Sequence, residues 1–177
     1  MKHLFDRVRP LLEEMAEELD LPLETVAAIC SIESGFRSHA ENPRSRAAGL
    51  FQFIPAVAAE YELKNPFNPK ANCEAATKLF EDNRKRLARR GVPLNILTAY
   101  LSHQQGAKGC AEIYESALFG EPLTAARYRN MRANLPQSVR IAFEEEASDP
   151  AKAQIFLHWW YKRLQRELRK VRVYLAD

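Results

Sequence analysis

Apolar residues recur mostly at helical spacing along this chain. The first such run covers residues 5–19 and carries acids on its opposite side; its apolar members are Phe5, Val8, Leu11, Leu12, Met15 and Leu19. Residues three and four apart share one face of a helix, so this run predicts an amphipathic helix. A second helix is expected directly after the first. Asp20 is its predicted N-cap, Pro22 lies in its first turn, and Gly35 ends it.

The middle of the chain alternates polar segments with shorter helical patterns. The expected elements are a loop over 37–47, a small hairpin or extended arm over 49–53, a short helix over 55–61 and a helix opening at 68–69. Asn68-Pro69 has the form of an N-cap followed by a first helical residue, and Gly91 to Pro93 breaks the helix that follows. Residues 94–103 predict another helix, ended by Gly106 and Gly109.

The last third of the chain gives weaker signals until its final helix. Helices are expected over 111–118 and 138–146, with a mixed segment over 121–137 between them. A long amphipathic helix starts at Asp149-Pro150, and its apolar stripe is Phe156, Trp160, Leu164, Leu168, Val171 and Leu175. Its basic face is expected to be solvated, with docking on an anionic wall polymer or a partner protein as the alternative. The predicted fold class is therefore all-α, with at most a minor hairpin.

Length and composition narrow the picture only moderately. A chain of 177 residues can bury one sizeable core, so a single domain over 1–177 is expected. The net charge of +3 permits an anionic polymer as partner without requiring nucleic acid. No apolar run is long enough to insert into a membrane. The charged N-terminus lacks the apolar core of a signal peptide, so we expect synthesis in the cytoplasm without one.

The three cysteines do not point to a metal or a cofactor. Cys30, Cys73 and Cys110 lack the spacing of metal ligands, and the first two fall on apolar faces, where cysteine is usually a small core residue. No metal site and no cofactor are therefore expected.

Glu33 is the most unusual residue of the second predicted helix. It shares one face with Val26, Ile29 and Cys30, which places a carboxyl group at the end of an apolar stripe. Gly35 ends the helix just beyond it. Burial and the helix dipole both favour the protonated carboxyl group, as a general acid requires. The alternative is a helix-end glutamate that turns out to solvent.

Cleavage of a glycosidic bond needs a proton donor and a second group that stabilises the oxocarbenium-like centre. Glu33 suits the first role. The next acids, Glu41 and Glu60, offer no obvious second carboxylate. The substrate itself, for instance through an N-acetyl oxygen and then a sugar hydroxyl, is the remaining source of a nucleophile.

Four motifs in order resemble the soluble lytic transglycosylase domain, a relative of goose-type lysozyme. They are Glu33-Ser34-Gly35-Phe36 followed by Ser45, Gly49 to Pro55, Asn65 to Pro69, and Ala99 to Gly106. The last is similar to variants in phage-linked and secretion-linked muramidases. The resemblance covers residues 21–110, which it marks as a catalytic core, and leaves 111–177 as a helical C-terminal extension. It implies a lysozyme-like helical domain, α+β at most.

The resemblance implies that Glu33 is the sole catalytic acid and base. It would protonate the oxygen between N-acetylmuramic acid and N-acetylglucosamine, and then take a proton from the muramoyl C6 hydroxyl as a 1,6-anhydro ring closes. Gln52 would line the sugar site, with a hairpin-stabilising amide as the alternative. The remaining residues expected to bind substrate are Ser34, Ser45, Phe53, Tyr100, His103 and Gln104. For Ser34 and Ser45 a purely structural role is the alternative.

The last of the four motifs, Ala99 to Gly106, is the closing motif, and it departs from the family pattern. Aligned on Gly106, the family tyrosine and asparagine fall at His103 and Gln104, which would put His103 in place of a tyrosine hydroxyl near Glu33. Aligned on Tyr100 instead, the tyrosine is conventional and three extra residues follow. We favour the glycine register because the helix should end there. Val57 and Glu62 also depart, from a common Thr and a common Gly, with effects expected on packing.

The sequence therefore favours an enzyme that cuts peptidoglycan glycan strands and gives 1,6-anhydro products. Goose-type relatives position a water with aspartates, and no aspartate lies between Glu33 and Gln52, so hydrolysis is the second choice. A non-catalytic wall-binding or assembly module is the rival class, and a nucleic-acid binder rests on charge alone. Because no signal peptide is seen, we expect action in the periplasm or cell wall after delivery by a phage or secretion machine, with an immunity protein or a carrier as partner.

Overall fold

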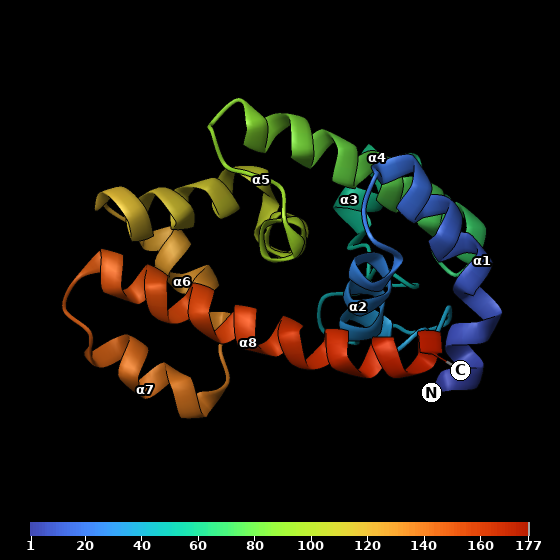
Figure 1. Cartoon of the computed structure of the whole chain (residues 1–177). Helices are drawn as coiled ribbons and strands as arrows, with labels where there is room; N and C mark the ends of the chain where they lie inside the picture. Colours follow the sequence, from blue (N-terminus) through green and yellow to red (C-terminus); the bar gives the residue numbers. More distant parts are fainter. Residues whose placement is uncertain (177) are drawn as a thin grey trace. The chain divides into compact units, whose positions relative to one another are not determined.

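A computed structural model describes residues 1–176, and its regular structure is helical throughout (Figure 1). The helices are α1 (Lys2–Leu19), α2 (Leu23–Ser34), α3 (Pro55–Glu60), α4 (Pro69–Ala88), α5 (Ile96–Phe119), α6 (Ala125–Ala133), α7 (Gln137–Glu145) and α8 (Asp149–Ala176). Among the described residues, β pairing is limited to two isolated antiparallel bridges, Glu41 with Ala48 and Ala48 with Phe53. The prediction of an all-α fold is confirmed.

The chain divides into two compact units. Unit 1 comprises residues 1–82 together with the described residues from Leu164 onward, and unit 2 comprises residues 83–163. The predicted single domain, with a core over 21–110 and an extension over 111–177, stays a prediction. Each unit is described below by itself.

Unit 1 joins the two ends of the chain. The end of α8 returns to α1, where the Lys2 ammonium donates to the Tyr174 carbonyl oxygen at 3.1 Å, and Figure 1 shows the termini side by side. The Phe5 ring packs edge-on against Phe36 with centroids 5.3 Å apart, and the Tyr174 ring lies 6.0 Å from Phe5. These contacts bury the start of the loop that follows α2.

The junction between α1 and α2 corrects one prediction. Asp20 does not cap the start of α2; it ends α1 in the left-handed conformation, with φ 50°, and its N–H donates to carbonyl oxygens of α1. Pro22 holds the N-cap position of α2 instead. Because proline has no N–H and a fixed φ, it suits a helix start without any side-chain cap.

Unit 2 is built around α5, which is longer than predicted. It opens with a capping box, in which the Asn95 side chain accepts from Leu97 N and Thr98 N and the Thr98 hydroxyl accepts from Asn95 N. The helix breaks at Gly106 (φ 72°, ψ 156°), as predicted, but it resumes at once. Gly109 lies inside the second segment, so the prediction that it ends the helix is wrong.

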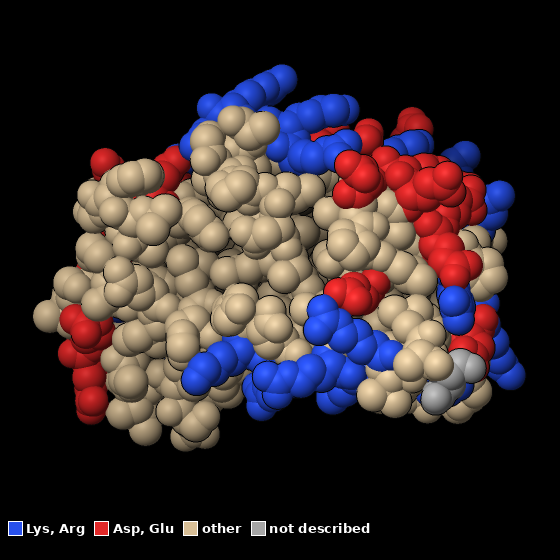
Figure 2. All heavy atoms as spheres, in the orientation of Figure 1, with Lys and Arg blue, Asp and Glu red and all other residues tan. Residues whose placement is uncertain are grey.

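The polar surface of α8 follows the predicted pattern. Figure 2, drawn from the same side as Figure 1, shows Lys and Arg side chains over the place of this helix. The exposed bases are Lys162, Arg166, Arg169, Lys170 and Arg172. The stripe residues Phe156, Trp160, Leu164, Leu168 and Val171 are buried, whereas Leu175, the last residue of the predicted stripe, is half-buried. Among the described helices, none has both the length and the apolar character needed to cross a bilayer.

Candidate active site

Glu33 lies on the last turn of a helix that is buried on nearly every side. Residues 25–31 and Ser34 of α2 are all buried, whereas Glu33 is half-buried. Gly35 ends the helix in the left-handed conformation (φ 61°, ψ 36°), and its N–H donates to the Ser31 carbonyl oxygen at 3.0 Å. The predicted helix end is confirmed. Glu33 therefore lies at the margin of the core, where the residue is partly shielded from water.

Two small side chains fix this last turn. The Ser34 hydroxyl, 1% exposed, donates to the Cys30 carbonyl oxygen at 3.2 Å. The Cys30 thiol in turn lies 3.8 Å from the Leu50 carbonyl oxygen and ties α2 to the arm over residues 49–53. Burial raises the pKa of the Cys30 thiol, so it stays a protonated, small core side chain. Ser34 thus has a structural task, and its predicted contact with substrate stays a prediction.

The arm is a tight turn rather than a true hairpin. Ala48 and Phe53 exchange two backbone hydrogen bonds of 3.0 Å, and Gln52 between them has a positive φ of 47°. The Gln52 Nε2 atom donates to the Ala40 and Gly49 carbonyl oxygens at 3.1 and 3.0 Å. These bonds are what the hairpin-stabilising alternative predicts. Gln52 Oε1 accepts no hydrogen bond from residues 1–176, and contact of Gln52 with substrate stays a prediction.

The side chain of Asn72, on α4, holds the arm through hydrogen bonds, and the sequence analysis did not identify this residue. This side chain, 0% exposed, accepts from Phe51 N at 2.9 Å and donates to the Pro66 carbonyl oxygen at 2.9 Å. A Cβ atom on Gly49 would lie 2.0 Å from that same Pro66 oxygen. A signal was present, because Asn72 shares a helix face with Ala76 and Phe80 and is the polar residue on that apolar stripe.

The loop between Glu33 and the arm closes on itself. Ser45 is exposed, and its hydroxyl accepts from Ala47 N at 3.3 Å. The Glu41 carboxylate pairs with Arg46 at 2.6 Å. Phe53, 2% exposed, belongs to the core of this region. Substrate contacts of Ser45 and Phe53 stay predictions.

The other predicted residues share one turn of α5 in unit 2. Tyr100 is 3% exposed and packs against Trp160 with ring centroids 4.7 Å apart, so its ring is part of the core. His103 and Gln104 are half-buried. Gln104 Nε2 donates to the Tyr100 hydroxyl oxygen at 3.1 Å. Binding of substrate by these three side chains stays a prediction.

A series of hydrogen-bonded polar side chains leads from Gln104 to Arg127, and the sequence analysis did not predict Arg127. Gln105 Nε2 donates to Gln104 Oε1 at 3.0 Å, and Arg127 of α6 donates to Gln105 Oε1 at 3.3 Å. Arg127 also donates to the Glu112 carboxylate at 3.0 Å. Nothing in the sequence marks Arg127, since it comes from the mixed segment and its partners are set by the fold.

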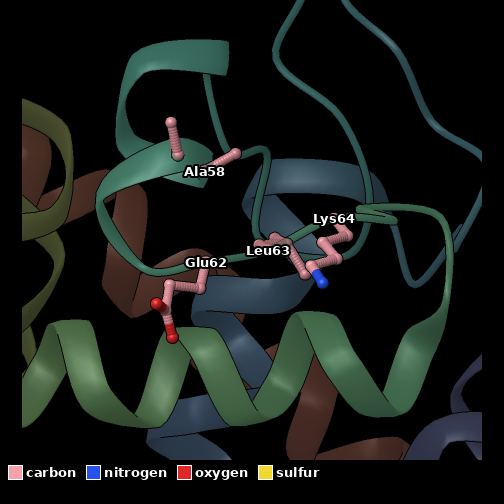
Figure 3. A pocket seen from close by; sticks show the side chains of 5 residues that line it. Ala58, Glu62, Leu63 and Lys64 are labelled. Carbon is pink, nitrogen blue, oxygen red and sulfur yellow. The ribbon is translucent and has the colours of Figure 1, made fainter.

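A pocket of about 450 Å³ on the loop after α3 contains none of the predicted residues. Figure 3 shows its side chains, with the Glu62 carboxyl group and the Lys64 amine directed apart. Glu62 has a positive φ of 54°, a conformation that glycine adopts without strain. This is the physical reason why glycine suits this position in the family pattern. Within residues 1–176, no group of three or more His, Cys, Asp or Glu side chains is placed to hold a metal ion.

A comparison with family models assigns part of this chain to a known family. The family model described as transglycosylase SLT domain matches residues 10–112, a span that contains Glu33, Gln52 and Gly106. A search of curated proteins gives no match. Members of the matched family cleave glycosidic bonds of peptidoglycan in the cell wall. Since the match covers more than half of the 177 residues, this chain belongs to the transglycosylase SLT domain family.

Proposed function

We propose that this protein is a lytic transglycosylase that cuts the bond between N-acetylmuramic acid and N-acetylglucosamine, with Glu33 as its general acid and base. The observation that carries the proposal is the position of Glu33. This residue is half-buried on the last turn of a buried helix, and that helix is tied to the Gln52 arm through Cys30 and Leu50. Partial burial and the negative end of the helix dipole both favour a protonated carboxyl group.

The reaction needs only one carboxyl group. Protonated Glu33 gives its proton to the glycosidic oxygen as the bond to the muramoyl C1 breaks. The resulting carboxylate then accepts the proton of the C6 hydroxyl, whose oxygen bonds to C1 and closes the 1,6-anhydro ring. Protons balance, since Glu33 ends protonated and no water is consumed. Such acid and base steps contribute about a hundredfold to ten-thousandfold each.

The state of the loop acids favours this outcome over hydrolysis. Hydrolysis needs a group that positions water, usually a second carboxylate. Between Glu33 and Gln52 the acid is Glu41, and its carboxylate is already paired with Arg46 at the surface. A ring closure by the substrate's own hydroxyl requires no such group.

The other residues predicted to bind substrate would orient the sugar. Gln52 Oε1 can accept from a hydroxyl or acetamido N–H, because Nε2 is already used by the backbone. We assign Ser45 and Phe53 to the same sugar site, and Ser34 to holding the helix end. His103 and Gln104 are assigned to substrate binding in unit 2, with Tyr100 as their buried support.

For its setting, we propose delivery to the wall by a phage particle or a secretion machine. A wall-cutting enzyme is harmful to the cell that makes it if it reaches that cell's own wall. An immunity protein that blocks Glu33 and a carrier that binds outside residues 10–112 are the expected partners.

The decisive variant is Glu33→Gln, which keeps the shape of the side chain and removes its proton. We expect release of soluble fragments from purified peptidoglycan to fall at least about a hundredfold, with an unchanged circular dichroism spectrum. Glu41→Gln is the matched control, because it is the same change on a nearby exposed acid, and it should keep its activity. Full activity of Glu33→Gln would refute the assignment.

Product analysis separates the chemical alternatives. Mass spectrometry of the released muropeptides should find anhydro ends, which are lighter than reducing ends by one water. Reducing ends would identify a hydrolase. Binding of the wall without any released fragment would identify a non-catalytic wall-binding or assembly module.

A further inference from the structure

Glu167 is the only charged residue that is buried within residues 1–176, and the proposed reaction does not use it. It is 3% exposed and lies on the part of α8 that belongs to unit 1. A charged side chain is rarely buried unless a partner compensates for its lost hydration. Glu167 also lies well beyond residue 112, where the match to the family model ends. The reason for a glutamate here must therefore come from its contacts.

Both carboxylate oxygens of Glu167 accept a hydrogen bond. The hydroxyl of Ser31, on α2, donates to Oε1 at 2.6 Å, and the Lys170 ammonium group donates to Oε2 at 3.1 Å. Ser31 is itself buried, with 9% of its surface exposed. An apolar side chain of similar volume is often as stable in such a place as a buried ion pair. Stability alone therefore does not account for Glu167, whereas a directed bond to Ser31 is something that only a polar side chain supplies.

On α2, this bond acts at the turn that carries Glu33. Ser31 precedes Glu33 by two residues, and its carbonyl oxygen accepts from the Gly35 N–H that ends the helix. Just after that end, the Phe36 ring packs edge-on against Tyr174 of α8, with centroids 6.4 Å apart. The end of α8 therefore contacts the chain both before and after Glu33, and Figure 1 shows α2 beside this end.

From these observations we infer that Glu167 is a positioning residue for Glu33, because its bond to Ser31 sets the place of the last turn of α2. The inference rests on the proposed function, in which the Glu33 carboxyl group must reach first the glycosidic oxygen and then the C6 hydroxyl. A misplacement of about 1 Å between reacting groups can cost about a hundredfold in rate. Glu167 itself touches no substrate in this scheme. A helix outside the span matched by the family model thus contributes to the geometry of the active site.

A second polar link between the same two helices offers a matched control. Arg172 of α8 donates to the Glu24 carboxylate at 2.8 Å, in the first turn of α2. Glu24 lies at the opposite end of this helix from Glu33, and both partners are more exposed than Glu167. Loss of this pair removes a contact between α8 and α2 but leaves the last turn of α2 untouched.

The first test is Glu167→Met, which keeps the approximate volume of the side chain and removes the acceptor for Ser31. With soluble glycan chains of peptidoglycan as substrate, kcat should fall at least about tenfold, while KM changes by less than about twofold. Glu167→Gln retains an oxygen that can accept from Ser31, so it should recover most of kcat. Arg172→Met should keep both constants within about twofold, because exposed ion pairs contribute little.

The variant Ser31→Ala/Glu167→Met separates positioning from stability. Removing both partners leaves neither of them buried without a bond, so the melting temperature should return toward that of the wild type. Its kcat should stay as low as that of Glu167→Met, because the bond to α8 is still missing. Recovery of kcat together with the melting temperature, or an equal loss of kcat in Arg172→Met, would overturn the inference. Where Glu167→Met alone does not fold, the double variant carries the test.

Hydrogen exchange gives a readout that needs no catalysis. The Gly35 amide, which donates to Ser31, should exchange at least about tenfold faster in the double variant than in the wild type. In Arg172→Met it should exchange at the wild-type rate, and unchanged exchange in the double variant would overturn the inference. Digestion by the wild type with no loss of kcat in the Glu167 variants refutes only the positioning role. The expected exchange pattern in a protein that releases no fragments refutes only the proposed function.

Discussion

Two glycines mark the two regions that carry the predicted residues, and they are held in different ways. Gly49 opens the Gln52 arm in unit 1, and Gly106 breaks α5 in unit 2; both have positive φ, 83° and 72°. A Cβ atom on Gly49 would meet the Pro66 oxygen at 2.0 Å and Asn72 Nδ2 at 2.2 Å. A Cβ atom on Gly106 would meet nothing within 4 Å.

The difference shows which contacts fix each region. The arm is held by backbone atoms and one buried amide, so a Cβ atom added at Gly49 collides with groups that are themselves fixed. The break in α5 is fixed by long side chains, through Gln104, Gln105 and Arg127. A region held by backbone tolerates little change in sequence, whereas one held by side chains can be rebuilt with other residues.

The largest effect is expected from Gly49→Ala. A positive φ costs a non-glycine residue about 1–2 kcal/mol, and forced overpacking costs about 1–3 kcal/mol more. The free energy of unfolding should fall by about 3 kcal/mol, and lytic activity should fall with it because Gln52 moves. Chemical denaturation followed by circular dichroism measures the first, and fragment release the second.

The variants Gly106→Ala and Gly91→Ala measure the cost of the backbone conformation without the cost of a collision. Gly91 also has a positive φ, 69°, and open space around it, so both variants meet the conformational cost alone. Gly91→Ala should lose about 1–2 kcal/mol. Gly106→Ala should lose about 1–3 kcal/mol, because ψ 156° at positive φ is a conformation essentially restricted to glycine. If Gly106→Ala destabilises as strongly as Gly49→Ala, the contrast between the two regions is wrong.

The next effect concerns the side chains that hold the α5 break. Arg127→Met keeps the volume over Gly109 but removes the bonds to Gln105 and Glu112, whose side chain is 23% exposed. We expect a loss of about 1.5–2 kcal/mol, in the lower part of the range of about 1.5–3 kcal/mol for a hydrogen bond to a charged group, because the pair is partly exposed. If Gln104 binds the sugar, KM should rise more than kcat falls.

Arg127→Lys separates charge from geometry in the same network. The lysine ammonium group keeps the attraction to Glu112. It lacks the planar guanidinium group of arginine and cannot donate to Gln105 at the same time. Recovery of stability without recovery of KM would show that Arg127 positions Gln104. Equal recovery of both would limit Arg127 to a structural task.

The sequence predicts most of what backbone-level rules control. The end of α2 at Gly35, the start of α4 at Pro69 and the break at Gly106 follow from residues with few allowed conformations. The position of Glu33 beside the core follows from helical spacing alone. Asp20 was misplaced because it serves equally well as a cap or as a left-handed helix end, and only the packing of α1 on α2 decides.

The rest of the candidate site depends on pairs of residues far apart in sequence. Asn72 and the arm are 21 residues apart at their shared bond, and Arg127 and Gln105 are 22 apart. Neither pair has a local pattern, because each partner alone reads as an ordinary polar residue on a helix. The use of Gln52 Nε2 by the backbone is likewise invisible until Ala40 and Gly49 are brought beside it.

Buried thiols in the two units should make the free energy of unfolding depend on pH. Burial raises the pKa of the Cys110 thiol to about 12, although the nearby Arg127 charge lowers it. In the unfolded chain this thiol loses its proton near its ordinary value of 9.0, so between about pH 9 and 12 the folded state binds more protons and stability falls as pH rises. From pH 8 to pH 10 this thiol alone should remove about 1.4 kcal/mol.

Cys110→Ala is the control for that slope. Urea denaturation at the two pH values should show the wild type losing about 1.4 kcal/mol more than the variant. Cys73→Ala should behave alike in unit 1, since burial also raises the pKa of its thiol to about 12. Identical pH slopes in wild type and variants would mean that these thiols ionise freely in the folded protein.

The smallest expected effect reverses the glycine experiment. Glu62 is exposed and has φ 54°, so it carries the left-handed strain that Gly49 and Gly106 avoid. Glu62→Gly should remove about 1–2 kcal/mol of strain but adds about 0.5–1 kcal/mol of chain entropy to the unfolded state. The net gain should be about 0.5 kcal/mol, measured by denaturation, with unchanged fragment release. Glu62→Ala keeps the Cβ atom and should gain nothing, and a matching gain there would assign the effect to lost charge rather than to backbone conformation.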